Sequence, residues 1–372
     1  MKFNKWTVAL AAIGVINLTS ARADDNMKMN AVQTALSNTT LSGYVDTAAT
    51  WNLGSQGGTT SGNVPPGVHP DGFSLNAIDL TLDKPEDESP WASGYHVEFM
   101  AGPDAIPSSG AVNGIRQAYL TLRTPVGNGI DWKAGVWDSI LGYESSSDPL
   151  NPNYTRSYAY DIEPTTFTGI LGTYKVSDMV TVQAGVADSL NGVNQLSPVE
   201  SQKSYMGDVS LTAPDSWGWI KGGTLYVGVV NSDASTTGEG ATWFYAGATL
   251  PTPNAALKFG GSFDYVDSHD SGPGNPSDNS VWDIALYSTY QASQKLSLNF
   301  RGEYLNASQS DASNAEEFTV DAQYSLWANV LSRVELRWDH NENGDNGLFG
   351  GYGSNGTHSN NFMLAANLIY QF

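Results

Sequence analysis

Phe362-Met363-Leu364-Ala365-Ala366-Asn367-Leu368-Ile369-Tyr370-Gln371-Phe372 ends the chain, and every second side chain from Phe362 to Phe372 is apolar. Successive side chains of a β-strand point to opposite faces, so one face of this strand is apolar to its last residue and the other is largely polar. An alternating strand that finishes on an aromatic residue is typical of the last strand of a bacterial outer-membrane β-barrel. We expect Phe372, Tyr370 and Leu368 to form the signal that the barrel-assembly machinery recognises.

The amino end has the pattern of a secretory signal peptide. Lys2 and Lys5 precede an apolar stretch at 6–18, and Ala21-Arg22-Ala23 offers a small-x-small cleavage site. We therefore expect residues 1–23 to be removed near Ala23 and 24–40 to form a short flexible leader in the periplasm. No later run of 18 apolar residues predicts a transmembrane helix, so the mature chain is either soluble in the periplasm or spans the outer membrane as strands.

Composition narrows the classes of partner. The 372 residues include no cysteine, which excludes disulfides, thiolate nucleophiles and cysteine-based metal sites. Removing Lys2, Lys5 and Arg22 from the 17 basic residues leaves 14 against 38 acidic ones. So acidic a surface argues against nucleic acid and favours cations or lipopolysaccharide bridged by divalent ions. The alternative is that acidic loops only keep the exported chain soluble.

The rest of the sequence is patterned as alternating strands rather than amphipathic helices. Each segment has about the 9–11 residues that a tilted transmembrane strand requires, or slightly more. Sixteen segments can be counted, at 41–53, 73–85, 91–102, 115–125, 130–139, 167–177, 180–190, 204–213, 222–232, 241–250, 256–268, 281–293, 296–308, 316–327, 330–342 and 360–372. The predicted fold is all-β: one transmembrane, antiparallel, up-and-down β-barrel over 41–372.

The connections between these segments alternate in length, as expected of a barrel with short periplasmic turns and long outer loops. The short set is 86–90, 126–129, 178–179, 251–255, 293–295 and 328–329, with 214–221 a little longer. The long set is rich in Gly, Ser, Asn, Asp and Pro and includes 54–72, 140–166, 191–203, 269–280 and 343–359. This sorting is independent support for the barrel.

The alternation also assigns faces to the strands. Segment 330–342 sets apolar side chains against charged ones, namely Val334, Leu336 and Trp338 against Arg333, Glu335 and Arg337. An unpaired charge buried in a dry core would cost several kcal/mol, so we expect the charged face to line a water-filled lumen and to stay solvated.

Tryptophan is concentrated near the ends of the predicted strands, which favours aromatic girdles at the two membrane interfaces. The positions are Trp51, Trp91, Trp132, Trp243, Trp282, Trp327 and Trp338, with Trp217 and Trp219 in the connection at 214–221. The alternative is that strand ends of any β-protein attract aromatic residues.

Several motifs in the first half of the barrel resemble one known family. They are Leu41-Ser42-Gly43-Tyr44-Val45-Asp46, Phe73-Ser74-Leu75-Asn76, Gln117-Ala118-Tyr119, Gly142-Tyr143-Glu144, Asn151-Pro152-Asn153-Tyr154-Thr155-Arg156-Ser157 and Phe167-Thr168-Gly169. On these motifs the chain resembles the OmpL-like β-barrel porin-2 family of Gram-negative bacteria. The resemblance implies an outer-membrane barrel and a pore, and it names no solute.

The connection at 140–166 is the candidate constriction. A loop of about 27 residues in a compact protein requires a functional reason, and in the general porin architecture the third outer loop folds into the lumen. Rings of charged side chains would then set ion preference. Candidates in the loop are Glu144, Asp148, Arg156, Asp161 and Glu163, and we expect its acidic members to face the basic residues of a wall set formed by Arg123, Lys133, Arg301, Glu303, Arg333, Glu335 and Arg337. The alternative is that the loop packs outside as an ordinary surface loop.

Other constellations are weak. Asp339, Asn341 and Asn343 match the first half of a calcium loop, but Gly350 stands where a bidentate Glu is required, and a glycine- and asparagine-rich outer loop explains the same letters. Ser268-His269-Asp270-Ser271 holds the residue types of a catalytic triad, but adjacent residues rarely hold a triad in line. No cofactor is predicted.

The favoured function is passive diffusion of small hydrophilic solutes and ions, with modest cation selectivity from the acidic excess. Two alternatives stay open: an outer-membrane enzyme on a barrel scaffold, such as a lipase, with His340 as its candidate base, and a structural or adhesive barrel that does not conduct. Sixteen-stranded porins are often homotrimers, which is analogy of fold only.

Overall fold

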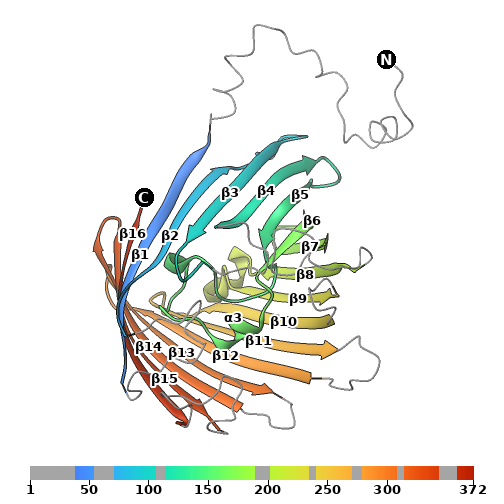
Figure 1. The fold of residues 1–372 in the computed structure, drawn as a ribbon. Coiled ribbons are helices and arrows are strands. Elements are labelled where there is room, and N and C mark those ends of the chain that lie inside the picture. Colours follow the sequence, from blue (N-terminus) through green and yellow to red (C-terminus); the bar gives the residue numbers. More distant parts are fainter. Residues whose placement is uncertain are drawn as a thin grey trace, which may run out of the picture.

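The computed structural model describes residues 38–53, 71–105, 114–188, 202–233, 240–269, 279–307, 314–342 and 358–372. They form a closed barrel in which sixteen antiparallel strands pair in sequence order and β1 closes the ring against β16 (Figure 1). The predicted fold class and strand number are confirmed. The strands are β1 (Thr40–Asn52), β2 (Gly72–Lys84), β3 (Ser93–Ala101), β4 (Ile115–Thr124), β5 (Ile130–Asp138), β6 (Thr166–Lys175), β7 (Val180–Ala187), β8 (Ser204–Thr212), β9 (Thr224–Ser232), β10 (Gly240–Pro251), β11 (Leu257–His269), β12 (Asn279–Gln291), β13 (Leu296–Ala307), β14 (Asn314–Trp327), β15 (Val330–Asn341) and β16 (Asn360–Gln371).

Some sequence predictions fall outside the described residues. These are the signal peptide at 1–23, most of the leader at 24–40, and most of the outer connections at 54–72, 191–203, 269–280 and 343–359. Three short helices are described: η2 (Asp148–Leu150), α3 (Tyr158–Ile162) and η3 (Asp215–Ile220). No helix in the described ranges is long and apolar enough to cross a membrane.

The seam of the barrel joins the two ends of the folded chain. β1 and β16 pair in register from Tyr44 opposite Gln371 to Asn52 opposite Met363. Beyond this ladder, Gly43 N donates to Phe372 O at 3.1 Å and Phe372 N donates to Gly43 O at 3.0 Å. A Cβ atom at Gly43 would collide with the carbonyl of Asp79 and lie 2.9 Å from the Phe372 ring, so the close approach of three strands requires glycine here.

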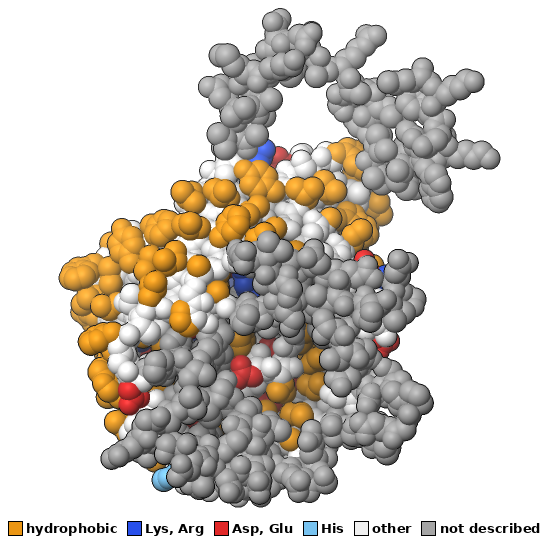
Figure 2. Space-filling view, in the orientation of Figure 1, with side chains coloured by type: hydrophobic (Ala, Val, Ile, Leu, Met, Phe, Trp, Pro, Cys, Tyr) orange, Lys and Arg blue, Asp and Glu red, His pale blue; other side chains and the backbone are white. Residues whose placement is uncertain are grey.

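The outer face of the wall is apolar. Phe318, Val334 and Leu368 are 50%, 54% and 48% exposed on the side that faces away from the lumen. Figure 2 shows hydrophobic side chains gathered over the outer face of the first strands of the barrel. A closed ring satisfies the backbone hydrogen bonds of every strand, and an apolar band lets that ring contact lipid.

The inner face carries the charged rows that the alternation predicted, but these rows are not solvated. Arg301, Arg333, Glu335 and Arg337 are each at most 1% exposed. The expectation that lumen water covers them is wrong, because residues of the long connection between β5 and β6 contact them instead.

The tryptophans divide between the two faces. Trp51, Trp91, Trp217, Trp219 and Trp327 are exposed, as a girdle requires. Trp243 is different, because its indole N–H donates to Ile162 O at 2.8 Å inside the barrel. Its place in the predicted girdle is wrong, since alternation along β10 puts Trp243 on the same inner face as the buried Tyr245.

Candidate functional site

Residues 139–165, here called the 139–165 loop, connect β5 and β6 and lie within the ring of strands (Figure 1). Its base is closed by the pair Asp138 and Thr166 and by the hydrogen bond from Ser139 N to Thr165 O at 2.9 Å. Helix α3 begins after Ser157, whose Oγ accepts a hydrogen bond from Tyr160 N at 3.2 Å. Serine at this position satisfies one of the N–H groups that the first turn leaves unpaired.

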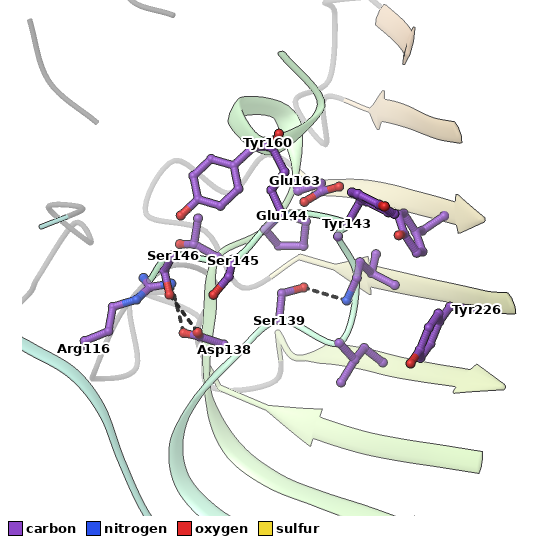
Figure 3. A pocket seen from close by; sticks show the side chains of 16 residues that line it. Arg116, Asp138, Ser139, Tyr143, Glu144, Ser145, Ser146, Tyr160, Glu163 and Tyr226 are labelled. Carbon is purple, nitrogen blue, oxygen red and sulfur yellow. Dashed lines mark hydrogen bonds and ion pairs between the residues drawn. The ribbon is translucent and has the colours of Figure 1, made fainter. Parts of the chain in front are cut away.

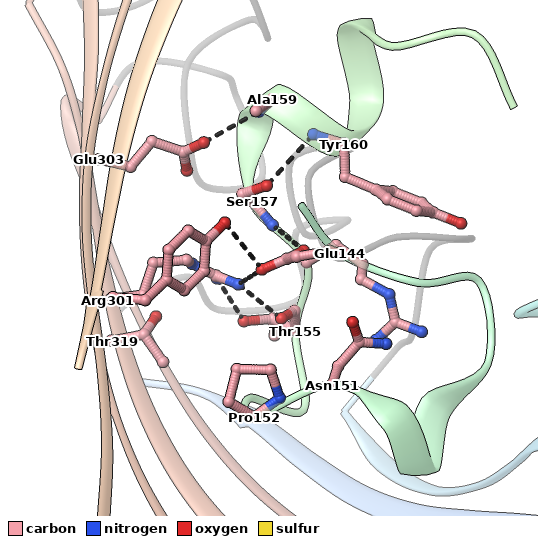
Figure 4. Close-up of polar contacts among 12 residues, drawn as sticks. Glu144, Asn151, Pro152, Thr155, Ser157, Ala159, Tyr160, Arg301, Glu303 and Thr319 are labelled. Atoms are coloured by element: carbon pink, nitrogen blue, oxygen red, sulfur yellow. Dashed lines mark hydrogen bonds and ion pairs between the residues drawn. The ribbon is translucent and has the colours of Figure 1, made fainter. Parts of the chain in front are cut away.

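Arg301 of β13 fastens the middle of the 139–165 loop to the opposite wall (Figure 4). Its Nη1 donates to Glu144 Oε1 at 2.8 Å and to Thr155 O at 2.7 Å, and its Nη2 donates to Thr155 Oγ1 at 2.9 Å. Its Nε donates to Glu317 Oε2 on β14 at 2.7 Å. A planar guanidinium with five donors can serve the wall and the loop at once, which an ammonium cannot do with the same geometry.

Two wall carboxylates receive backbone N–H groups of the loop. Glu335 accepts from Tyr154 N at 2.6 Å and from Thr155 N at 3.0 Å. Glu303 accepts from Tyr158 N at 2.8 Å and from Ala159 N at 2.9 Å, at the first turn of α3. Charge-assisted hydrogen bonds of this kind are roughly twice as strong as neutral ones, so each carboxylate holds a short length of loop backbone in place.

The other two wall arginines bind loop carbonyls rather than loop carboxylates. Arg333 Nη2 donates to Asp148 O at 3.1 Å and to Asn151 O at 2.6 Å. Arg337 Nη1 donates to Arg156 O at 2.6 Å, while its Nε donates to Asp339 of its own strand at 2.7 Å. The prediction that these arginines contact the loop is therefore right, but the groups that they bind are backbone carbonyls and not the predicted acidic side chains.

The loop is also braced internally. Arg156 Nη2 donates to Asp148 Oδ1 at 2.7 Å, and both side chains are almost fully buried. Glu144 Oε2 accepts a hydrogen bond from Ser157 N at 2.8 Å. The Glu144 carboxylate therefore joins the first part of the loop to the start of α3 and to Arg301. Breaking a buried ion pair leaves an uncompensated charge, so these contacts make the loop conformation strongly specified.

Two of the predicted wall residues lie away from the loop. Arg123 occupies the short-turn end of β4 and pairs with Asp131 of β5. Lys133 of β5 lies over the Tyr119 ring, 4.7 Å from its centroid. The expectation that these two face the acidic loop residues is wrong, because alternation fixes the face of a side chain but leaves its height along the barrel open.

The last acidic loop residues differ in surroundings. Asp161, within α3, keeps an exposed side chain. Glu163, directly after α3, is buried, and burial together with the nearby Asp264 and Glu144 carboxylates raises its pKa well above the usual range. Gly142 has a φ of +116°, which favours glycine, and a Cβ atom at this position would collide with the Glu163 carboxylate unless that side chain moved.

Carboxylates that could share a cation occur at one place in the described part of the chain. Asp46, Asp104 and Asp148 are all buried, and one oxygen of each lies within 4.8 Å of the other two. Of the weak calcium candidates, Asp339 is bonded to Arg337 and to the Tyr158 hydroxyl, Asn341 ends β15, and Asn343 lies outside the described residues. The stretch 339–343 stays a weak candidate for calcium, and no metal is predicted there.

Within the described part of the chain, two cavities lie between the loop and the inner wall. The first, of about 330 Å³, is lined by Arg116, Asp138, residues 139–146 and several tyrosines, and Arg116 forms an ion pair with Asp138 there, with Nη2 and Oδ1 2.9 Å apart (Figure 3). The second, of about 570 Å³, lies between 149–152 of the loop and the short-turn ends of β9, β10, β12, β13 and β14. Both are lined by Tyr143, Tyr226 and Tyr245, so these three side chains lie where the cavities adjoin.

Sequence reasoning missed these tyrosines. Tyr226 and Tyr245 occupy inner-face positions of β9 and β10, and the Tyr143 ring stacks on Tyr287 of β12 with centroids 4.2 Å apart. Alternation could have assigned the two strand residues to the lumen. No signal in the sequence indicates that Tyr143 lies against β12, since that contact depends on the path of the loop.

Comparison with known proteins agrees with this architecture. The model of the family described as "Putative beta-barrel porin-2, OmpL-like" matches residues 38–372. A search among curated proteins found no match.

Similar solved structures are outer-membrane channels and porins. The anion-selective porin from Comamonas acidovorans has a TM-score of 0.62 at 12% identity, over 90% of this chain and 99% of that one. The outer membrane channel DcaP of Acinetobacter baumannii has a TM-score of 0.60 at 14% identity, over 90% of this chain and 97% of that one. The trimer form of OmpT from Vibrio cholerae has a TM-score of 0.61 at 13% identity, over 90% of this chain and 99% of that one. Identities this low show a shared fold.

Proposed function

Because the chain belongs to the OmpL-like putative β-barrel porin-2 family, we propose that it is an outer-membrane porin that lets small hydrophilic solutes and ions diffuse down their gradients. One observation carries the proposal. The 139–165 loop is fastened to β13 and β15 on one side, while two adjoining cavities remain beside it on the β9 and β10 side. Barrels of sixteen strands are wide enough to leave an aqueous channel, and the loop would narrow it.

The charged rows take a different role in this proposal from the one that alternation suggested. Arg301, Arg333 and Arg337 are covered by the loop, so they hold the constriction in place instead of lining the path of a solute. The charged side chains that line the first cavity are Arg116, Asp138, Glu144 and Glu163. Solute selectivity would then follow from the width of the passage and from this smaller set.

Modest cation selectivity is part of the proposal. The acidic excess of the chain supports it. The Comamonas porin is described as anion-selective, but a likeness at 12% identity carries no selectivity to this chain. The reversal potential across a planar bilayer in a salt gradient tests it, and a potential of the sign for anion preference would contradict it.

Two other functions compete with a channel. The barrel enzyme requires a histidine that lies between an acid and a serine. His340 Nδ1 is bonded to Asn360, and both ring nitrogens of His96 face carboxylates, Asp83 and Glu98, rather than a serine. The non-conducting barrel requires a plugged lumen, and the two cavities beside the loop count against it. Neither alternative has an observation in its favour.

We place the chain in the outer membrane after cleavage near Ala23, with the assembly machinery, lipid and lipopolysaccharide as its partners. A homotrimer is the assembly we propose, supported by the trimer form of OmpT among the similar structures. The native mass of the protein extracted in mild detergent tests this, and a monomer mass under those conditions would contradict it.

Single-channel recording tests the central proposal. The mature protein, refolded in detergent and added to a planar bilayer, should give stepwise conductance increments. Heat modifiability on gels would show that the barrel has formed before it is added. A correctly folded barrel that inserts and gives no conductance would overturn the diffusion channel and favour the structural barrel.

A further inference from the structure

The larger cavity has no charged side chain in its lining. Eighteen residues line it, and their side chains are small, aliphatic, aromatic, hydroxyl-bearing or amide-bearing. This is unusual for this barrel, because the neighbouring inner wall of β13 to β15 carries a dense set of buried Arg, Glu and Asp residues. The 139–165 loop separates the two regions by covering the charged rows.

Resting on the channel proposed above, we propose that this cavity, with Tyr143, Tyr226 and Tyr245 where it adjoins the first cavity, is a binding subsite for an uncharged, polyhydroxylated solute of sugar size. Its volume of about 570 Å³ lies within the range of about 300–1,000 Å³ that small-molecule sites occupy. Solutes of this class would be selected over ions of the same size as they pass the constriction.

The tyrosines supply flat apolar faces with a polar edge. Tyr226 is 40% exposed although it points into the lumen, so its ring is accessible to a solute. The Tyr143 ring is held against Tyr287 by stacking, and Gly260 and Gly247 leave the space that the Tyr143 and Tyr245 phenols occupy. A sugar ring presents C–H groups on its faces and hydroxyls at its rim, which matches an aromatic ring beside hydrogen-bonding groups.

The rest of the cavity wall provides hydrogen-bonding groups without charge. The hydroxyls are those of Thr224, Thr249, Thr289 and Ser297, and the amides are those of Gln291, Asn299 and Gln323. A neutral polyol can exchange its hydrogen bonds with water for bonds with these groups. An ion would lose part of its hydration and meet no opposite charge, which is unfavourable.

Sugar-induced block of the ion current tests the subsite. Maltose, titrated onto open channels in a planar bilayer, should reduce the conductance in a saturable way. Tyr226→Ala should weaken this block roughly fivefold, the loss expected for one aromatic face, and Tyr226→Phe should retain most of it. Tyr205→Ala is the matched control, because Tyr205 is 58% exposed on β8 and lines neither cavity.

A second measurement needs no variant. Uptake of labelled glucose into proteoliposomes should be inhibited by excess maltose and much less by the same concentration of gluconate. Conducting channels that maltose does not block, equal block in Tyr226→Ala, or equal inhibition by gluconate would each overturn the subsite. Absence of any conductance would instead overturn the channel itself, so the two failures are distinguishable.

Discussion

Arg301 and Glu144, 157 positions apart in the chain, meet inside the barrel with Nη1 and Oε1 2.8 Å apart. Both side chains are at most 1% exposed. One residue belongs to the wall and the other to the 139–165 loop, so this pair is one of the contacts that hold the loop across the lumen. The width of the remaining passage therefore depends on a buried electrostatic contact and not on packing alone.

Replacing Arg301 should release the loop. Arg301→Met leaves Glu144 and Glu317 buried without their partner, and breaking such a pair typically costs about 3–5 kcal/mol. We expect a lower unfolding midpoint in detergent and larger, noisier single-channel conductance. Lys175→Met is the control, because the exposed pair of Lys175 and Asp178 contributes little. Unchanged midpoint and conductance in Arg301→Met would contradict the role of this contact.

Glu335 should act through the loop backbone. Glu335→Ala removes the acceptor of Tyr154 N and Thr155 N, and each unsatisfied buried group costs about 1–3 kcal/mol. Chymotrypsin should then cut the loop faster in Glu335→Ala, with Glu335→Gln intermediate because its amide keeps one acceptor oxygen. Ser332→Ala, on the outer face of the same strand, should be cut at the wild-type rate. Equal rates for Glu335→Ala and wild type would show that this carboxylate does not hold the loop.

Most of the barrel could be predicted because its rule is local. Alternation with a period of two assigns each residue of β15 to a face, and the turn between β6 and β7 is short enough to mark a strand boundary. An even number of such strands lets the last strand, which leads to Phe372, pair antiparallel with the first strand, which contains Tyr44. None of these inferences needs to know which distant residues touch.

The interior of the barrel could not be predicted in the same way. Alternation gives Arg301 and Arg123 the same kind of face, but only their heights along the strands separate a loop contact from a pair with Asp131. The position of Trp243 near a strand end predicts a place in the girdle. Alternation along β10, however, puts Trp243 on the same inner face as the buried Tyr245. Contacts of the loop depend on a path that no periodic pattern encodes.

Stability of the docked loop should depend on pH through Glu163. Burial, with Asp264 and Glu144 nearby, raises its pKa, so the folded state keeps this proton at pH values where the unfolded chain has lost it. Stability is then greatest below the ordinary carboxyl range and declines as the pH rises towards the raised pKa. We expect Glu163→Gln to raise the unfolding midpoint at pH 8 and to flatten this decline.

The control for the pH experiment is a carboxyl group whose pKa is lowered instead of raised. Asp87 is exposed, and its hydrogen bonds with Ser89 lower its pKa. A carboxyl group with a lowered pKa adds stability as the pH rises, so Asp87 cannot cause the decline expected from Glu163. Asp87→Asn should keep the wild-type slope. A Glu163→Gln slope identical to that of Asp87→Asn would show that Glu163 is not the group that titrates.

Closure of the barrel should depend on Gly43 and Phe372 more than conduction does. Deleting Phe372 removes two backbone hydrogen bonds to Gly43, at 3.1 and 3.0 Å, and the aromatic end of the last strand. Gly43→Val brings a side chain against the Asp79 carbonyl and the Phe372 ring, so it should impair the same step by steric conflict. We expect both variants to lower the yield of heat-modifiable barrel in the outer membrane several-fold, while the channels that do assemble keep wild-type conductance, since neither residue lines the two cavities. Normal yield for both variants would contradict the importance of this seam, and altered conductance at normal yield would move its role from assembly to the pore.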